Sequence, residues 1–176
     1  MNAARLTNHM AQNASTVRAL VQGLTDAQAH VRPNPDSWSV VEVLCHLLDE
    51  EREDFRVRID YALNHPGETA PRIAPGTWVE ERRYNEQDPY QVLEGFLRQR
   101  ELSLAWLRSL ADADWEATYP APWGPIRAGD LAHAWLAHDI LHLRQLVELR
   151  WHHLTSEAAP YDVQYAGPWQ ESAAEE

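Results

Sequence analysis

Lysine is absent from this sequence of 176 residues, so all 15 of its basic residues are arginine. Without lysine there is no Schiff-base chemistry on a carbonyl substrate or on pyridoxal phosphate. A P-loop or kinase phosphate clamp of the usual kind also needs a lysine. The missing residue type therefore excludes several large enzyme classes before any motif is considered.

Positive charge is scarce as well. The chain has 27 acidic residues against 15 basic ones, a net charge of −12 and a pI of about 5.1. Proteins that bind nucleic acid or anionic membranes need clustered cations. We therefore expect no nucleic-acid partner and no membrane partner, although a local arginine patch is compatible with this balance.

Cysteine and long apolar runs are the next absences. Cys45 is the single cysteine and cannot form an intramolecular disulfide, and the opening segment MNAARLTNHM has no apolar signal region. No run approaches the roughly 20 apolar residues of a membrane span. Together these features predict a cytoplasmic protein.

Glycine is also rare, at seven residues, whereas leucine, alanine, arginine and glutamate are abundant, which favours long helices. Apolar residues recur at steps of three and four in four segments, so the fold class is predicted to be an all-α four-helix bundle. The predicted helices cover residues 3–24, 40–64, 88–110 and 127–153.

The segments outside these helices give weaker signals. Residues 65–88 are rich in proline and lack periodicity, so they either cross the bundle end to end or line a site. A short hairpin within residues 71–84 is an alternative, and no alternating pattern elsewhere demands a sheet. We expect a single bundle domain over residues 1–154 and an acidic, partly ordered tail over residues 155–176.

Histidine is abundant, with nine residues, and three of them suggest a site. His138 and His142 lie four residues apart, so their imidazoles leave the same helix face one turn apart and can converge on one cation. His46 lies on the expected buried side of the second helix, which opens with a Ser39 and Glu42 capping box. Taken alone, His46 is interpreted as a hydrogen-bonded core histidine. Facing helices would add its nitrogen to the pair and form an open zinc or nickel site.

Two motifs, PDSWSVVEVLCHLLDEE and HDILHLRQL, resemble the DinB/YfiT-like superfamily of metal-binding four-helix bundles, which is distinct from the similarly named polymerase. The resemblance spans residues 1 to about 153. It implies an up-down-down-up bundle with a long crossover between the second and third helices. It also implies a metal triad formed by one histidine of the second helix, here His46, and an H-x-x-x-H pair, here His138 and His142.

The resemblance extends to function. Members of that superfamily include metal-dependent transferases that add bacillithiol, mycothiol or glutathione to electrophiles, a maleylpyruvate isomerase and hydrolases. We therefore expect transfer of a low-molecular-weight thiol to a small-molecule electrophile through a zinc or nickel ion. A metal-dependent hydrolase and a non-enzymatic, stress-related metal-binding or ligand-binding bundle stay open as alternatives, as does a homodimer formed through bundle faces.

Three further residues lie close to the proposed ligands in sequence. Glu50, one turn after His46, could orient that histidine or act as the catalytic base; its alternative is a solvated charge in the acidic run 49–54. Gln145 could reach the same cavity or simply be a polar residue near the helix exit. Cys45 points about 100° away from His46 and is expected to be a small core residue rather than part of a dyad.

A thiol cosubstrate is anionic, so a site that binds it needs cations at the mouth of its pocket and side chains that form the pocket walls. The candidate arginines are Arg82, Arg83, Arg127 and Arg144. Two loop tryptophans, Trp78 and Trp123, could wall a substrate pocket. The tryptophans expected to fill the core or gaps between helices are Trp38, Trp106, Trp115, Trp135 and Trp151. Of the remaining histidines, His133 is off the ligand face, and His152 and His153 are expected at the surface.

Overall fold

The structure is a computed structural model that describes residues 2–169 of the chain. Its long helices are α1 (Ala3–Val21), α3 (Val40–Glu53), α4 (Phe55–Asn64), α6 (Pro89–Ser109) and α7 (Ala128–Glu157). The shorter elements are α2 (Asp26–Ala29), α5 (Pro75–Glu81), the 3-10 turns η1 (Tyr84–Glu86) and η2 (Gln164–Ala166), and the strands β1 (Thr118–Ala121) and β2 (Gly124–Arg127).

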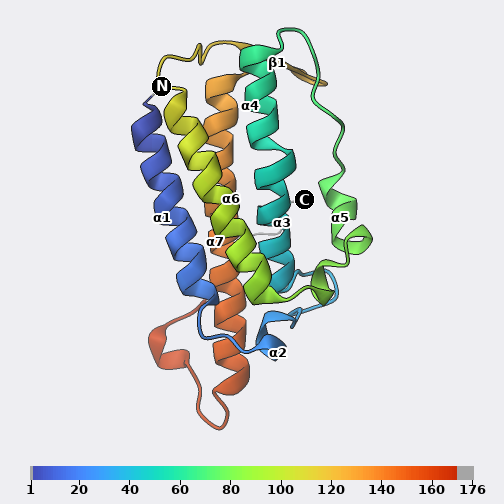
Figure 1. Ribbon diagram of the computed structural model, residues 1–176. Coiled ribbons are helices and arrows are strands. Elements are labelled where there is room, and N and C mark those ends of the chain that lie inside the picture. Colours follow the sequence, from blue (N-terminus) through green and yellow to red (C-terminus); the bar gives the residue numbers. More distant parts are fainter. Residues whose placement is uncertain (1, 170–176) are drawn as a thin grey trace.

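The bundle consists of four long helical segments, here called rods (Figure 1). The first rod is α1, the second is α3 followed by α4, the third is α6 and the fourth is α7. The first and last rods run in one direction and the two middle rods run in the other. Residues 65–88 return along the side of the bundle between the second and third rods, and α5 lies within them. The all-α bundle with up-down-down-up topology and a long crossover is therefore confirmed.

The second rod differs from the prediction because helix 40–64 is interrupted at Asp54, whose φ and ψ are −114° and −96°. α4 begins at the next residue, Phe55, and its Arg58 pairs with the Asp54 carboxylate. Aspartate favours such breaks because its short side chain competes for helix hydrogen bonds. Apolar periodicity did not reveal the interruption, since both halves keep an apolar face.

The structure has a β-hairpin, but it does not lie within residues 71–84, where the sequence analysis considered one. Within residues 71–84 the chain forms the helix α5, in which Pro75 occupies the first turn and Trp78 is buried. The antiparallel hairpin forms instead from β1 and β2, where Tyr119 pairs with Ile126. Gly124 there has a φ of 129°, which favours glycine. Its strands have four residues each and carry prolines, which explains why no alternation was visible.

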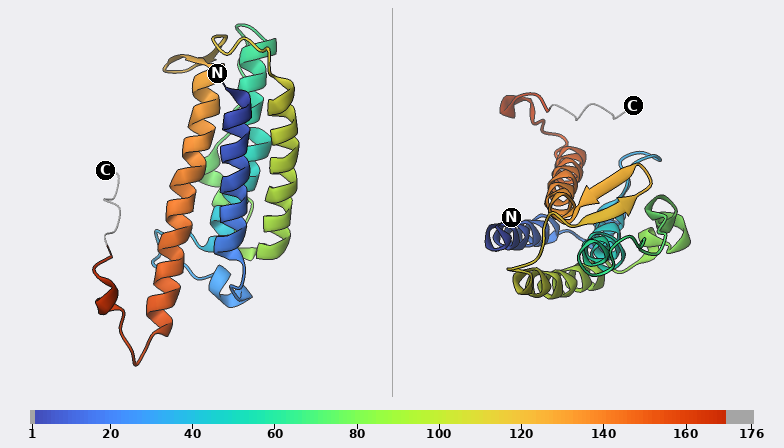
Figure 2. Two further views of the ribbon diagram at one scale, coloured as in Figure 1. Left: turned by 90° about the vertical axis from the view of Figure 1, so that its left-hand side faces the viewer. Right: turned by 90° about the horizontal axis from the view of Figure 1, so that it is seen from above.

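The hairpin covers one end of the bundle, and the C-terminal tail leaves α7 on its outer side (Figure 2). α7 continues to Glu157, three residues beyond the expected domain end, and residues 170–176 of the expected tail lie outside the described part of the chain. Within residues 2–169, no helix is long and apolar enough to cross a membrane.

The apolar core is divided into two clusters by a layer of buried charge. Arg100 of α6 donates two hydrogen bonds of 2.7 Å to Asp139 of α7 and one of 2.6 Å to Glu51 of α3. Trp135 Nε1 also donates to Glu51, and Asn13 of α1 donates to Asp139. This buried ion layer therefore ties all four rods together.

The layer corrects the expectation that the acidic run 49–54 faces mostly water. Asp49, Glu50 and Glu51 are 8, 4 and 0 % exposed. Asp49 accepts a hydrogen bond from Tyr84, and Glu51 is held by Arg100. Buried carboxylates of this kind are tolerated because donors surround them, which sequence periodicity does not report.

Candidate metal centre

Three histidines meet at the level of the ion layer. His46 of α3 and the pair His138 and His142 of α7 each offer a nitrogen, and these ligand atoms all lie within 4.8 Å of one another. The Nε2 atom of His138 lies 3.1 Å from Nε2 of His46 and 3.1 Å from Nε2 of His142. The predicted convergence of the two helices is therefore present in the structure.

These separations match the geometry that one divalent ion requires. With metal–nitrogen bonds of about 2.0–2.1 Å and angles between 90° and 109°, neighbouring nitrogen atoms would lie roughly 2.8–3.4 Å apart. Three imidazole nitrogens suit zinc and nickel, and a triad leaves further coordination positions open. The donor set and its spacing both fit a divalent ion.

The three imidazoles are electrically neutral at physiological pH, as metal ligation requires. Burial, reinforced by the neighbouring histidines, lowers the pKa of His46 to about 3. Burial, with His142 adding to it, lowers the pKa of His138 to about 4, and burial also lowers the pKa of His142. Protons therefore compete little for these nitrogens near pH 7.

The start of α3 fixes the position of His46. Ser39 caps the helix and Glu42 bonds back to the Ser39 N–H at 2.8 Å, which confirms the predicted capping box. Arg32 holds the buried Glu42 carboxylate with two hydrogen bonds. Ser39 Oγ also donates to Asn85 at 2.6 Å, so the crossover segment is tied to the helix end. His46 follows less than two turns later on this anchored helix.

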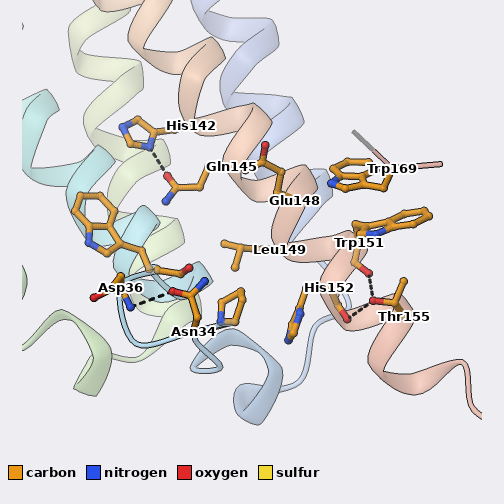
Figure 3. Close-up of a pocket in the computed structure, with 13 residues that line it drawn as sticks. Asn34, Asp36, His142, Gln145, Glu148, Leu149, Trp151, His152, Thr155 and Trp169 are labelled. Atoms are coloured by element: carbon orange, nitrogen blue, oxygen red, sulfur yellow. Dashed lines mark hydrogen bonds between the residues drawn. The ribbon is translucent and has the colours of Figure 1, made fainter. Parts of the chain in front are cut away.

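Gln145 sets the tautomer of His142. Its Oε1 accepts a hydrogen bond of 2.9 Å from Nδ1 of His142 (Figure 3). The Nε2 lone pair of His142 then stays free, and this atom lies 3.1 Å from Nε2 of His138. An acceptor behind a ligating imidazole fixes ring orientation and raises its basicity. Of the two interpretations of Gln145, contact with the site is the one confirmed.

Aromatic rings enclose the cluster on two sides. The ring centroid of Trp38 lies 5.0 Å from that of His46, and its plane is parallel to that of His142 at 6.2 Å. Phe55 lies 5.2 Å from His138, and it begins the helix that follows the interruption at Asp54. These rings restrict water around the nitrogens, which strengthens electrostatic interactions there.

Glu50 lies directly behind His46. Its Oε1 is 3.9 Å from Nδ1 of His46, and that nitrogen is buried without a hydrogen-bond partner among the described residues. Burial raises the pKa of the Glu50 carboxyl to about 7, despite the nearby Arg58. The solvated-charge interpretation of Glu50 is therefore wrong, because the side chain is buried against the cluster.

A groove of about 870 Å³ opens beside His142. Figure 3 shows His142 and Gln145 at one end, Trp151 and Trp169 farther along α7, and Asp36 on the opposite wall. The groove is lined by Pro33, Asn34, Asp36, Ser37, Trp38, His142, Gln145, Glu148, Leu149, Trp151, His152, Thr155 and Trp169. Its volume is typical of small-molecule sites.

Comparison with known proteins agrees with this geometry. The family model of the DinB superfamily matches residues 9–146. The chain belongs to the DinB superfamily. Among solved structures, YfiT from Bacillus subtilis, described as a probable metal-dependent hydrolase with an unusual four-helix bundle topology, has a TM-score of 0.76 at 18% identity, covering 86% of this chain and 87% of that one. At this identity the likeness shows a shared fold. No curated protein matches the sequence.

None of the four candidate arginines of this DinB superfamily member belongs to the described lining of the groove. Arg82 pairs with Asp49 and Glu53, and Arg83 pairs with Glu86. The remaining two candidates are also paired: Arg127 with Glu116 and Asp130, and Arg144 with Glu148 at 3.9 Å. Among the described residues that line the groove there is no arginine.

The tryptophan assignment was also wrong. Trp78 is 4 % exposed and packs in the core, and Trp123 is 81 % exposed in the hairpin turn. The groove is walled instead by Trp38, Trp151 and Trp169, of which the last two stack with centroids 4.8 Å apart. The position of Trp169 depends on the path of the tail, which local patterns do not encode.

The single cysteine and the remaining histidines lie outside the cluster of His46, His138 and His142. Cys45 is buried in the core, as expected. His133 is exposed and its Nδ1 bonds to the Gly129 carbonyl, away from the cluster. His153 is only 7 % exposed, because α7 extends past it, so its assignment to the surface was wrong. His152 is half-buried and lines the open groove. The ion layer around Arg100 was missed, since a lone arginine in a helix gives no signal of burial.

Proposed function

We propose that this protein is a metal-dependent enzyme that uses a divalent ion, zinc or nickel, held by His46, His138 and His142. The observation that carries the proposal is the convergence of three neutral imidazoles, in which Nε2 of His138 lies 3.1 Å from Nε2 of His46 and 3.1 Å from Nε2 of His142, next to a groove of small-molecule size. The description of YfiT as a probable metal-dependent hydrolase, at 18% identity, supports the same chemistry.

A divalent ion at these nitrogens would lower the pKa of a bound water or thiol, so that a nucleophile forms near neutral pH. The chain supplies the surrounding functions. Gln145 keeps the Nε2 lone pair of His142 available, and Trp38 and Phe55 exclude bulk water. The Glu50 carboxyl has a pKa of about 7, and its Oε1 lies 3.9 Å from Nδ1 of His46. From there it would orient His46 as a ligand, and it is the buried carboxylate at the site that could accept the proton that the nucleophile loses.

Hydrolysis is the reaction that the groove supports best. Water needs no recognition elements beyond the ion, whereas an anionic thiol cosubstrate needs a cation besides the ion for its other charged groups, and no arginine lines the described groove. Transfer of a thiol such as bacillithiol, mycothiol or glutathione is the second candidate. It is supported by the groove volume of about 870 Å³, which has room for a thiol beside an electrophile.

The first test is metal content. Purified wild-type protein is expected to carry one divalent ion per chain, measured by elemental analysis after gel filtration, and His142→Ala is expected to lose it. His133→Ala is the matched control, because His133 lies on the same helix and is exposed. The proposal fails if the wild type binds no metal, or if His142→Ala and His133→Ala retain equal amounts.

The second test separates hydrolase, transferase and binder. Metal-loaded protein is assayed for release of acid from ester and amide panels and for consumption of the three thiols with electrophiles. Hydrolysis without thiol, reduced at least about 100-fold in Glu50→Gln at unchanged metal content, supports the first candidate. Thiol-dependent turnover supports the second, and metal binding without any turnover identifies a non-enzymatic binder.

A further inference from the structure

The groove beside the candidate metal centre has an unusual charge pattern. Its lining contains two carboxylates, Asp36 and Glu148, and no arginine among the described residues. Since the chain has no lysine at all, histidine is the only other residue type there that can carry positive charge. Glu148 lies 3.9 Å from Arg144, but that arginine is not part of the lining.

The aromatic residues of the groove also favour a cationic ligand. Trp38 lies at the histidine end, and the Trp151 and Trp169 pair lies farther along α7. From His142 to Trp151 the helix rises by about 14 Å, at 1.5 Å per residue. Tryptophan faces and edges provide apolar area, and tryptophan is the side chain that best attracts an organic cation.

The arginines that could attract an anion gather elsewhere. A second hollow of about 290 Å³ lies between the second rod and α6 and is lined by Arg52, Arg56, Val57, Asp60, Gln99 and Trp106. It shares no lining residue with the groove. Two arginines and one carboxylate line this hollow, whereas two carboxylates and no arginine line the described groove, so the groove is the more negative of the two.

We propose that the groove selects an elongated organic cation, bearing an ammonium or a similar group, and disfavours anionic ligands. The reactive end of such a molecule would lie near His142, and its cationic part would lie between Asp36 and the stacked pair of Trp151 and Trp169. Negative walls with low-dielectric aromatic surfaces concentrate cations and repel anions. The assignment of the reactive end rests on the proposed function, whereas the charge preference of the groove does not.

The test uses two probes of similar shape and opposite charge, phenyltrimethylammonium and benzenesulfonate. Their binding to chelator-treated, metal-free protein is followed by ligand-observed NMR. The cation is expected to bind with a dissociation constant on the order of 1 mM, and the anion at least about fivefold more weakly. Metal-free protein is used because a bound divalent ion would attract the sulfonate by itself.

Two variants connect the preference to the groove. Asp36→Asn is expected to weaken cation binding about two- to fivefold and to reduce the preference over benzenesulfonate, and Trp151→Leu is expected to weaken it by a similar factor. The matched controls are Asp112→Asn and Trp123→Leu, whose side chains are exposed away from the groove lining. Both controls are expected to bind the cation as the wild type does.

Three results would overturn the proposal: equal or tighter binding of benzenesulfonate, no binding of the cation up to about ten times the expected constant, or groove variants that behave like their controls. Failure of the proposed function is recognised separately. A protein that binds no metal but prefers the cation loses the enzyme proposal and keeps the groove assignment. One that binds metal and prefers the anion does the reverse.

Discussion

The buried ion layer allows a sharp test of what holds this bundle around its histidines. Arg100 is 1 % exposed and donates hydrogen bonds to Asp139, to Glu51 and to the Met10 carbonyl. Replacing it with methionine keeps an unbranched apolar stem and removes the guanidinium with its charge. Two carboxylates then remain in the core without a counter-charge, and one of them directly follows His138 in α7.

The size of the effect follows from this geometry. Breaking a buried ion pair by removing one partner costs about 3–5 kcal/mol, because the remaining charge is left uncompensated. A loss of about 4 kcal/mol raises the unfolding constant by a factor of nearly 1,000, at 1.4 kcal/mol per tenfold change. With a urea m-value of roughly 2 kcal/mol per molar, the unfolding midpoint of Arg100→Met is expected to fall by about 2 M.

The assay is urea unfolding followed by tryptophan fluorescence and circular dichroism. Arg98→Met is the matched control, since Arg98 lies two residues earlier on the same helix and is exposed. Its midpoint is expected to change by less than about 0.3 M. Equal midpoints for the two variants would refute the idea that the layer is a stabilising, charge-compensated unit.

The pH dependence of the same variant has a definite sign. Burial raises the pKa of Glu51, and the positive charge of Arg100 opposes that rise. A carboxyl whose folded pKa exceeds its unfolded value stabilises the fold below the unfolded pKa and loses that contribution as pH rises through the folded pKa. The stability deficit of Arg100→Met relative to the wild type is therefore expected to be largest at pH 8 and to shrink toward pH 5. A deficit that grows on acidification contradicts this account.

Three further predictions concern the metal centre and its supporting helix. Gln145→Leu removes the hydrogen-bond acceptor behind His142 and is expected to lower zinc affinity by about 10- to 100-fold, measured by chelator competition. Gln145→Glu keeps an acceptor and is expected to change the affinity little. Equal losses in the two variants would contradict the idea that Gln145 fixes the tautomer of His142. Burial raises the pKa of the Cys45 thiol to about 12. An aromatic disulfide reagent at pH 8 is therefore expected to modify Cys45 only after the protein is unfolded in urea. Rapid labelling of the folded protein would show that the thiol is not buried. Ser39→Ala removes the N-cap of α3 and is expected to lower the free energy of unfolding in urea by about 1–2 kcal/mol. Ser15→Ala, at an exposed position, is the control. An equal change in both variants would argue against the capping role of Ser39.

Local sequence patterns were sufficient for the parts of the site that lie within single helices. The i, i+4 spacing placed His138 and His142 on one face, and the Ser39 and Glu42 box fixed the start of α3. These features depend on helix geometry alone, which repeats every 3.6 residues whatever the rest of the chain does. The bundle class followed for the same reason from apolar periodicity.

Other features escaped prediction because apolar periodicity does not report which polar groups a side chain contacts. The expectation for Glu50 was divided, and only the folded structure shows that its side chain is buried beside His46. Arg82 pairs with Asp49 and Glu53 of the distant helix α3. Arg83, Arg127 and Arg144 instead pair with carboxylates three or four residues away, and nothing in the sequence favoured these local pairs over a ligand. The hairpin at residues 118–127 is too short and too rich in proline to give a period of two.

The sequence by itself thus determined the four helices, the three candidate ligands and the absence of any lysine-dependent chemistry, because helical periodicity and residue type are local properties. Only the tertiary structure decided that His46 meets the pair on α7 at 3.1 Å, that Arg100, Glu51 and Asp139 form a buried layer beside them, and that the groove carries carboxylates and tryptophans instead of arginines. The physical reason is that desolvation and charge pairing depend on which faces of distant helices come together, and that information is spread over the whole chain.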